Sequence, residues 1–219
     1  MPNRGTVPPS PLVMLTEPTS ARAEAFRVLR ARLDQAGAGP LHTLLITSPT
    51  TRERRHLLAA NLAVAWAESG SSVVAVDADL HQPQLHQLFS LEAAPGLLQS
   101  VSAGSDVGQA LQPGPLPGLS VLAAGGVEPV PARVLGGKEF DEILANLCAR
   151  AERVILVAPP ALPVADASIL ASRLDGVVLL CSAYRTSRAS LREAKARMEG
   201  VNARILGAVL DNAPAMRAY

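Results

Sequence analysis

Two carboxylates, Asp77 and Asp79, stand at the end of the predicted strand 72–77. Ligands bind at the carboxyl ends of strands in a parallel sheet, and carboxylate oxygens are ligands that Mg²⁺ prefers. The pair is therefore a candidate metal site. The alternative is that both are loop acids satisfied by nearby backbone N–H groups. On these residues alone the two interpretations are evenly balanced.

An arginine-rich loop lies between a predicted strand at 41–47 and a predicted helix at 52–69. Residues 51–56 read T-R-E-R-R-H, and no glycine occurs between Gly39 and Gly70. A phosphate-cradling loop has the pattern G-x-x-x-x-G-K-[ST]. Its glycines let backbone N–H groups surround the anion, its Lys reaches the outer phosphates, and its hydroxyl holds Mg²⁺. We therefore expect the scaffold of a nucleotide-binding domain without the loop that binds nucleotide.

The cationic side chains of this loop, Arg52, Arg54, Arg55 and His56, have two interpretations. They form either a new anion site at the start of the helix or a solvated loop. Cations at a helix N-terminus oppose the helix macrodipole, so we expect the cluster to be strained or occupied. Arginine at a glycine position also adds a Cβ where the backbone needs positive φ, at a cost of about 1 kcal/mol.

A charged stripe runs along the predicted helix 20–34, for which Ser20 is a suitable N-cap. Glu24, Arg27 and Arg30 recur every three residues and therefore share one face. Such a stripe is usually a solvated surface with weak local ion pairs. The sharper hypothesis is an intermolecular contact.

Strands and helices alternate along the rest of the chain. Further strands are predicted at 119–123, 153–158, 176–182 and 203–210, with helices at 84–89, from 95, and at 131–150, 165–173 and 187–199. This alternation predicts an α/β fold with a mostly parallel sheet covered by helices on both faces. Residues 1–19 are rich in proline and are expected to be a disordered tail, and residues 20–219 a single domain.

Composition excludes several classes of protein. The 219 residues are 48% hydrophobic and 18% charged, which indicates a globular chain, and the net charge of +1 gives no case for nucleic acid. No apolar run is long enough to span a bilayer, and no signal peptide begins the chain. Cys148 and Cys181 are expected to be core thiols. We expect a cytoplasmic protein.

Four motifs together resemble the cytoplasmic kinase domain of bacterial tyrosine kinases of capsule and exopolysaccharide production. That family belongs to the larger MinD/ParA-like group of P-loop ATPases. The motifs are E-x-x-R-x-x-R at Glu24, T-S-P at 47–49 with A-A-N-L-A at 59–63, V-D-A-D-L at 76–80, and P-P with V-A-D-A at 159–167. The resemblance implies a P-loop NTPase fold of MinD/ParA type, and a role in oligomerisation for Glu24, Arg27 and Arg30.

The departures from this family lie in the parts that carry its chemistry. Arg52, Arg54, Arg55 and His56 stand where the family has Gly, Gly, Lys and Ser or Thr. Val157 stands where the family has the Asp that ends its Walker B strand. Because phosphoryl transfer depends on positioning and charge, losing these parts together predicts a large loss of rate.

The resemblance and the departures leave three hypotheses. The first is a degenerate, non-enzymatic domain without cofactor. It would assemble with itself, with homologous kinase subunits or with a membrane-anchored polysaccharide co-polymerase at the inner face of the membrane. The second is an active kinase using ATP and Mg²⁺, with Asp77, Asp79 and Arg55 in its site and Tyr219 as phosphoacceptor. The third is a partitioning ATPase of MinD/ParA type. In this chain no amphipathic membrane helix is visible after Leu210, which disfavours the version that cycles on and off the membrane.

Overall fold

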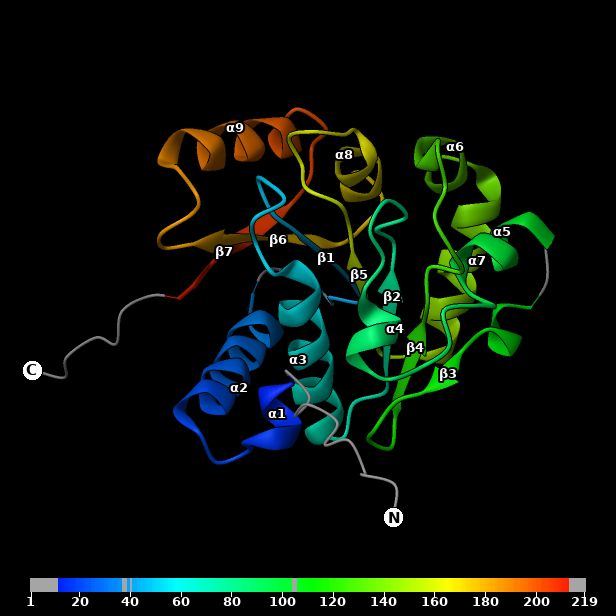
Figure 1. The fold of residues 1–219 in the computed structure, drawn as a ribbon, viewed down its shortest axis with the longest axis horizontal. Helices are drawn as coiled ribbons and strands as arrows, with labels where there is room; N and C mark the ends of the chain where they lie inside the picture. The colour runs from blue at the N-terminus through cyan, green and yellow to red at the C-terminus, as the bar shows by residue number, and fades with distance from the viewer. Residues whose placement is uncertain (1–11, 37–38, 40, 104–105, 213–219) are drawn as a thin grey trace, which may run out of the picture.

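In the part of the chain that the structure describes, seven strands form one sheet in the order β3-β4-β2-β5-β1-β6-β7 (Figure 1). The structure is a computed structural model that describes residues 12–36, 39, 41–103 and 106–212. All neighbouring strands are parallel except β3 and β4, which are antiparallel. The strands are β1 Thr43–Thr47, β2 Val73–Asp77, β3 Gln112–Pro113, β4 Leu119–Leu122, β5 Arg153–Val157, β6 Gly176–Ser182 and β7 Ile205–Asp211.

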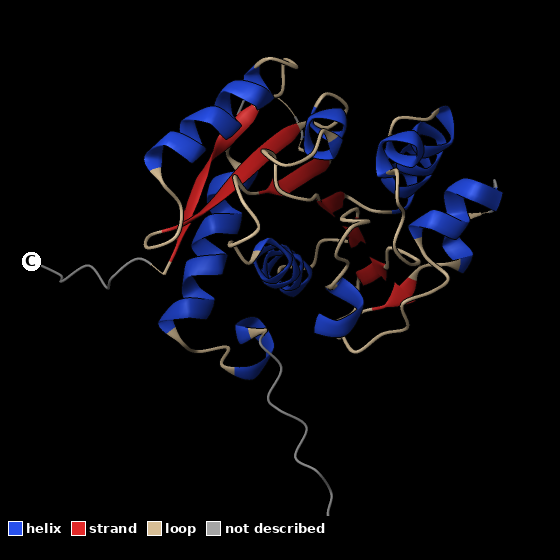
Figure 2. Ribbon diagram, turned by 45° about the horizontal axis from the view of Figure 1, so that its top comes forward, coloured by secondary structure: helices blue, strands red, loops and turns tan. Residues whose placement is uncertain are grey.

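Helices cover both faces of this sheet, as Figure 2 shows. They are α1 Val13–Thr16, α2 Ala21–Asp34, α3 Arg55–Glu68, α4 Leu85–Leu88, α5 Leu97–Ala103, α6 Pro131–Leu135, α7 Lys138–Arg150, α8 Asp166–Ala171 and α9 Arg188–Glu199, with a short 3₁₀ helix, η1, at Val107–Gln109. The predicted fold, a mostly parallel sheet between helices, is confirmed.

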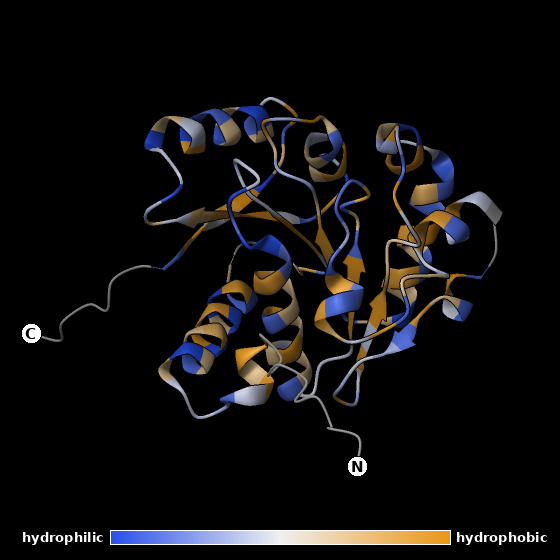
Figure 3. Cartoon of the chain, in the orientation of Figure 1, coloured by the Kyte–Doolittle hydropathy of each residue, from blue (hydrophilic) through white to orange (hydrophobic). Residues whose placement is uncertain are grey.

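Alternation along the strands separates two apolar cores. In β1, Leu45 packs with the side that holds α5 to α9, whereas Ile46 packs with the side that holds α1 to α4. Both residues are completely buried because successive side chains of a strand point to opposite faces. The central strands are accordingly hydrophobic throughout, whereas α9 is largely hydrophilic on its outer surface (Figure 3).

Three predictions about individual elements are wrong. Helix α3 begins at Arg55, three residues later than expected, since residues 48–54 form a separate loop. The predicted helix 131–150 is two helices, which meet at Gly136 and Gly137, because glycine weakens a helix interior. Gln112–Pro113, expected to be a surface loop, forms the short edge strand β3 against β4.

The predicted tail also needs correction. Residues 1–11 lie outside the described residues, but Leu12, Val13 and Met14 are buried in the core beside α2 and α3. The backbone N–H of Met14 donates to Oδ1 of the buried Asn61 at 3.0 Å. Helix α1 is therefore part of the domain, because apolar side chains and a buried hydrogen-bond partner on α3 hold it there.

Candidate functional site

The candidate site lies where the adjacent strands β2, β5 and β1 end. Residue pairs in register place Asp77 beside Val157 and Val157 beside Ile46. The parallel directions bring the loop after β1, the acidic turn after β2 and the turn after β5 to one edge of the sheet. The structure therefore brings together the arginine-rich loop and the two acids that the sequence singled out.

Asp77 is completely buried, and its carboxylate accepts bonds from the backbone of the next turn. Oδ2 accepts from the N–H groups of Gln84 and Leu85, each at 2.8 Å, and Oδ1 accepts from the N–H of Asp79 at 3.3 Å. These contacts match the second interpretation of the sequence, an acid satisfied by nearby N–H groups. They also orient one edge of the carboxylate, Oδ1, toward His56.

Asp79 forms a buried ion pair with Arg55. One guanidinium nitrogen of Arg55 contacts Oδ2 of Asp79, and Nε donates to the carbonyl oxygen of Ala158 at 2.8 Å. The other carboxylate oxygen, Oδ1, accepts from the N–H groups of His81 and Gln82. Arg55 is only 4% exposed. Its charge is thus directed inward, to Asp79 and to the turn after β5.

His56 completes this buried cluster. Its Nε2 lies 3.3 Å from Oδ1 of Asp77 and 3.8 Å from Oδ2 of Asp79, yet it has no hydrogen-bond partner of good geometry. The ring is 2% exposed. Arg55 and His56 lie in the first turn of α3, and both side chains reach the two acids at the end of β2.

The loop before α3 is closed around a carboxylate of its own. Glu53, 5% exposed, accepts at Oε2 from the backbone N–H and the hydroxyl of Thr50, at 3.1 and 2.8 Å. Its Oε1 accepts from the hydroxyl of Thr186, in the turn after β6. Sequence reasoning did not single out Glu53. The sequence marks Glu53 only as an acid among arginines, and its partner Thr186 is 133 residues away.

Arg52 and Arg54 lie on the outside of the loop. Arg54 pairs with Asp211 at the end of β7 at 3.0 Å, whereas Arg52 is exposed. The cations of the loop thus do not gather around one point, because Arg54 and Arg55 face different carboxylates. Positive φ is also not needed here: among described non-glycine residues it occurs at Ser90, Asn202 and Asn212. The expectation that Arg52 and Arg54 have a strained backbone with positive φ is therefore wrong.

A side-chain contact between His81 and Asp166 borders the site. Nε2 of His81 lies 2.7 Å from Oδ2 of Asp166, the buried first residue of α8. This contact joins the turn after β2 to the segment after β5. Asp166 lies within a sequence motif and His81 directly follows another, but their separation of 85 residues hides the pairing.

The predicted oligomerisation stripe is used inside this chain. Arg27 donates to both carboxylate oxygens of Glu68 on α3, at 2.7 and 2.8 Å, and more weakly to Glu24 at 3.3 Å. The hydrogen bond with Glu68 raises the pKa of Arg27, and the same bond lowers the pKa of Glu68. Arg30 pairs with Asp34 at 3.5 Å. These contacts lie within one chain and do not test oligomerisation, so the role of Glu24, Arg27 and Arg30 in it stays a prediction.

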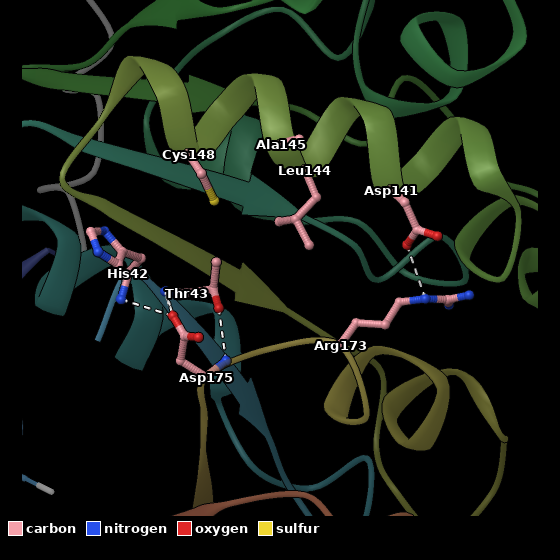
Figure 4. A pocket seen from close by; sticks show the side chains of 8 residues that line it. All are labelled: His42, Thr43, Asp141, Leu144, Ala145, Cys148, Arg173 and Asp175. Carbon is pink, nitrogen blue, oxygen red and sulfur yellow. Dashed lines mark hydrogen bonds and ion pairs between the residues drawn. The ribbon is translucent and has the colours of Figure 1, made fainter. Parts of the chain in front are cut away.

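A surface pocket of about 530 Å³ lies at the opposite edge of the sheet, beside α7 (Figure 4). Both of its carboxylates are already paired: Asp175 accepts from the backbone N–H groups of His42 and Thr43, and Asp141 pairs with Arg173 at 3.0 Å. Cys148 lines the pocket and is only half-buried, which corrects its expected place in the core. Burial nevertheless raises the pKa of its thiol. Cys181 is buried as expected.

Two remaining expectations concern the chain end and the membrane. The phosphoacceptor candidate Tyr219 lies outside the described residues. Among the described residues, no helix is both long and apolar enough to cross a bilayer.

Comparisons with known proteins agree with the motifs. No protein-family model matches the chain. The tyrosine-protein kinase YwqD of Bacillus subtilis is 35% identical over 210 residues, which cover 95% of this chain and 89% of YwqD. The tyrosine-protein kinase CpsD of Streptococcus agalactiae is 29% identical, over 86% of this chain and 82% of CpsD.

Solved structures agree as well. The chimerical protein CapA2B2 superposes with a TM-score of 0.90 at 27% identity, over 94% of this chain and 91% of that one. The kinase domain of Escherichia coli ETK gives 0.86 at 24% identity, over 95% and 84% of the two chains. MinD of Pyrococcus horikoshii, complexed with Mg-ADP, gives 0.65 at 19% over 77% and 69%, which shows a shared P-loop ATPase fold. The chain belongs to the family of bacterial tyrosine-protein kinases.

Proposed function

We propose that this chain is a non-catalytic member of its family that acts as an assembly or regulatory subunit in exopolysaccharide or capsule biosynthesis. The observation that carries the proposal is the buried ion pair of Arg55 with Asp79. In a kinase of this family the residue at position 55 would be a lysine that reaches phosphate, and Asp79 would act on the metal side. Here the two groups neutralise each other.

The surroundings of that pair do not fit a magnesium nucleotide. His56 offers an imidazole where a hydroxyl would hold Mg²⁺, and Val157, fully buried, offers no carboxylate. Glu53 accepts the N–H of Thr50, a loop donor of the kind that would otherwise face a phosphate. A buried carboxylate at that place repels phosphate. Binding a nucleotide would therefore require several satisfied contacts to break together.

Isothermal titration with MgATP tests this proposal. We expect no binding at micromolar concentrations, with an active relative such as YwqD as the positive control. A variant carrying Arg52→Gly, Arg54→Gly, Arg55→Lys and His56→Ser tests whether the loop itself is the obstacle, and circular dichroism checks that it folds. Micromolar affinity of the unmodified chain would contradict the proposal.

The second candidate is an active, ATP-dependent tyrosine kinase. Two observations favour it: Asp77 and Asp79 are retained at the carboxyl end of β2, and the YwqD relative is named as a tyrosine-protein kinase. Asp77 would then be the metal-side or base carboxylate, Arg55 the phosphate ligand and Tyr219 a target. A γ-phosphate transfer assay with an Asp77→Ala control decides this, since transfer no greater than that control eliminates the kinase.

The third candidate, a partitioning ATPase of MinD/ParA type, has only the shared fold in its favour. It needs the same nucleotide site, so the titration with MgATP bears on it equally.

Assembly is the positive half of the proposal. We infer partners among copies of this chain, homologous kinase subunits and a membrane-anchored co-polymerase, which would hold a cytoplasmic protein at the inner face of the membrane. Sedimentation velocity of Arg27→Ala and Arg30→Ala, beside the unmodified chain, tests the contribution of α2. Because Arg27 also ties α2 to Glu68, Arg30→Ala is the cleaner variant. An unchanged oligomer would make the stripe a solvated face.

A further inference from the structure

Tyr184 stands at the tip of a tight turn between β6 and α9. The turn is closed by the N–H of Thr186, which donates to the carbonyl oxygen of Ser182 at 3.0 Å, and by the N–H of Ser182, which donates to the hydroxyl of Thr186 at 2.8 Å. Tyr184 is 77% exposed. A rigid turn thus presents its side chain to solvent.

This exposure is unusual for a tyrosine, which normally buries its ring and hydrogen-bonds through its hydroxyl. Among the described residues, the hydroxyl of Tyr184 has no hydrogen-bond partner and the ring no aromatic partner. Tyr184 is also the single tyrosine in the described part of the chain. Its side chain therefore does nothing for the fold and is free to react.

The surroundings of Tyr184 are basic. Arg185 follows it directly, and Arg188 begins α9; both are exposed and form no ion pair with a described residue. Arg54 is held nearby, because its partner Asp211 also accepts the N–H of Ala183 through its carbonyl oxygen at 3.0 Å. A dianion on the Tyr184 ring would meet guanidinium groups, with which phosphate forms strong bonds.

We propose that Tyr184 is a phosphorylation site for a catalytically complete tyrosine kinase of this family. The phenol oxygen attacks the γ-phosphorus of ATP, the bond from that phosphorus to the bridging oxygen breaks, ADP leaves, and the phenol proton passes to a base of the kinase. The product carries a charge of about −1.5 to −2. It competes with Asp211 for Arg54, and so loosens the contact between the loop 48–54 and β7.

The test incubates the full chain with MgATP and an active family kinase, YwqD, and maps phosphate by mass spectrometry. We expect phosphate on the peptide 174–185, which contains Tyr184. Incorporation at this peptide persists in Tyr219→Phe and falls to background in Tyr184→Phe. Because Tyr184 is exposed, neither folding nor stability should change in that variant. Absence of phosphate at Tyr184, in a reaction where the kinase phosphorylates its own tyrosines, overturns the proposal.

A reaction without added kinase separates this inference from the proposed function. The inference rests on family membership and not on loss of catalysis. Phosphate that reaches Tyr184 without the added kinase would support the site and contradict the non-catalytic function. The regulatory consequence has its own readout: amide exchange in residues 48–54 should rise on phosphorylation, and remain unchanged when Tyr184→Phe is treated identically. Equal exchange in phosphorylated and unmodified protein would remove that consequence.

Discussion

Arg55 determines what the carboxyl edge of the sheet can do, because its charge compensates the buried carboxylate of Asp79. Both side chains are nearly or fully buried. Such pairs add little net stability when compared with apolar residues, but removing one partner leaves an uncompensated buried charge. Arg55 is therefore part of the folded core.

The variant Arg55→Met is expected to lower the free energy of unfolding by about 3–5 kcal/mol, since Asp79 loses its cation. Chemical denaturation at neutral pH measures the change. The exposed Arg52→Ala serves as the matched control and should change stability by less than about 0.5 kcal/mol. Adding Asp79→Asn to Arg55→Met should recover part of the loss, and a double variant as unstable as the sum of both single variants would contradict a direct pair.

Residue identities allowed the sequence to indicate this site, but not its internal contacts. The acids after β2 and the missing glycines were recognisable from their types and spacing. The pairing of Arg55 with Asp79 depends on the rotamer that Arg55 adopts beside the end of β5, and the pairing of His81 with Asp166 depends on the order of the strands. Neither property is local in the sequence, so the sequence left the anion site open as an alternative to a solvated loop.

Among the elements, the loop 48–54 is held from outside as well as from within. Glu53 binds Thr50 in the same loop and Thr186 after β6, and Arg54 binds Asp211 at the end of β7. The loop thus depends on two neighbouring strand ends. The expected helix start at Arg52 was wrong for this reason, because tertiary contacts of Glu53 outweigh the helix propensity of the arginines.

Removing the Glu53 side chain should open this loop. In Glu53→Ala the N–H of Thr50 loses its acceptor, and bonds to a charged carboxylate are worth about 1.5–3 kcal/mol. We expect the amide of Thr50 to exchange at least about tenfold faster. Hydrogen–deuterium exchange measures this, with the amides of β1 as an internal reference and Glu152→Ala as a surface control. An unaltered rate at Thr50 would mean that Glu53 does not close the loop.

The contact between α2 and α3 should depend on pH. Hydrogen bonding to Arg27 lowers the pKa of Glu68 below its ordinary value of 4.5. A lowered pKa gives stability that is present above the unfolded-state pKa and disappears as the pH falls through the folded-state value. In Glu68→Gln the loss of stability between about pH 5 and pH 3 should therefore be smaller than in the unmodified chain.

Denaturation curves at several pH values test this, and Glu142→Gln, another exposed acid, is the control. Because Glu68 is partly exposed, raising the salt concentration should weaken the difference. Identical pH dependence in Glu68→Gln and the unmodified chain would show that Arg27 is not engaged with Glu68 in solution. Arg27 would then be available for contacts between subunits.

For the whole molecule, the two-sided sheet was predictable because strands and helices alternate and the central strands are apolar throughout. The extent of the domain was not. Helix α1 is four residues long, follows a proline-rich segment and shows no period, so local signals favoured a tail. What holds it is a distant partner, Asn61, together with burial against α2 and α3.

Substitution of Met14 tests where the domain begins. Met14 is 3% exposed, and replacing a buried methionine by alanine removes apolar contact and leaves a cavity. Met14→Ala should lower the free energy of unfolding by about 2–5 kcal/mol, whereas the neighbouring exposed Glu17→Ala should leave it within about 0.5 kcal/mol. Urea denaturation measures both. If Met14→Ala costs no more than Glu17→Ala, residues 12–16 do not belong to the core, and the domain begins with α2.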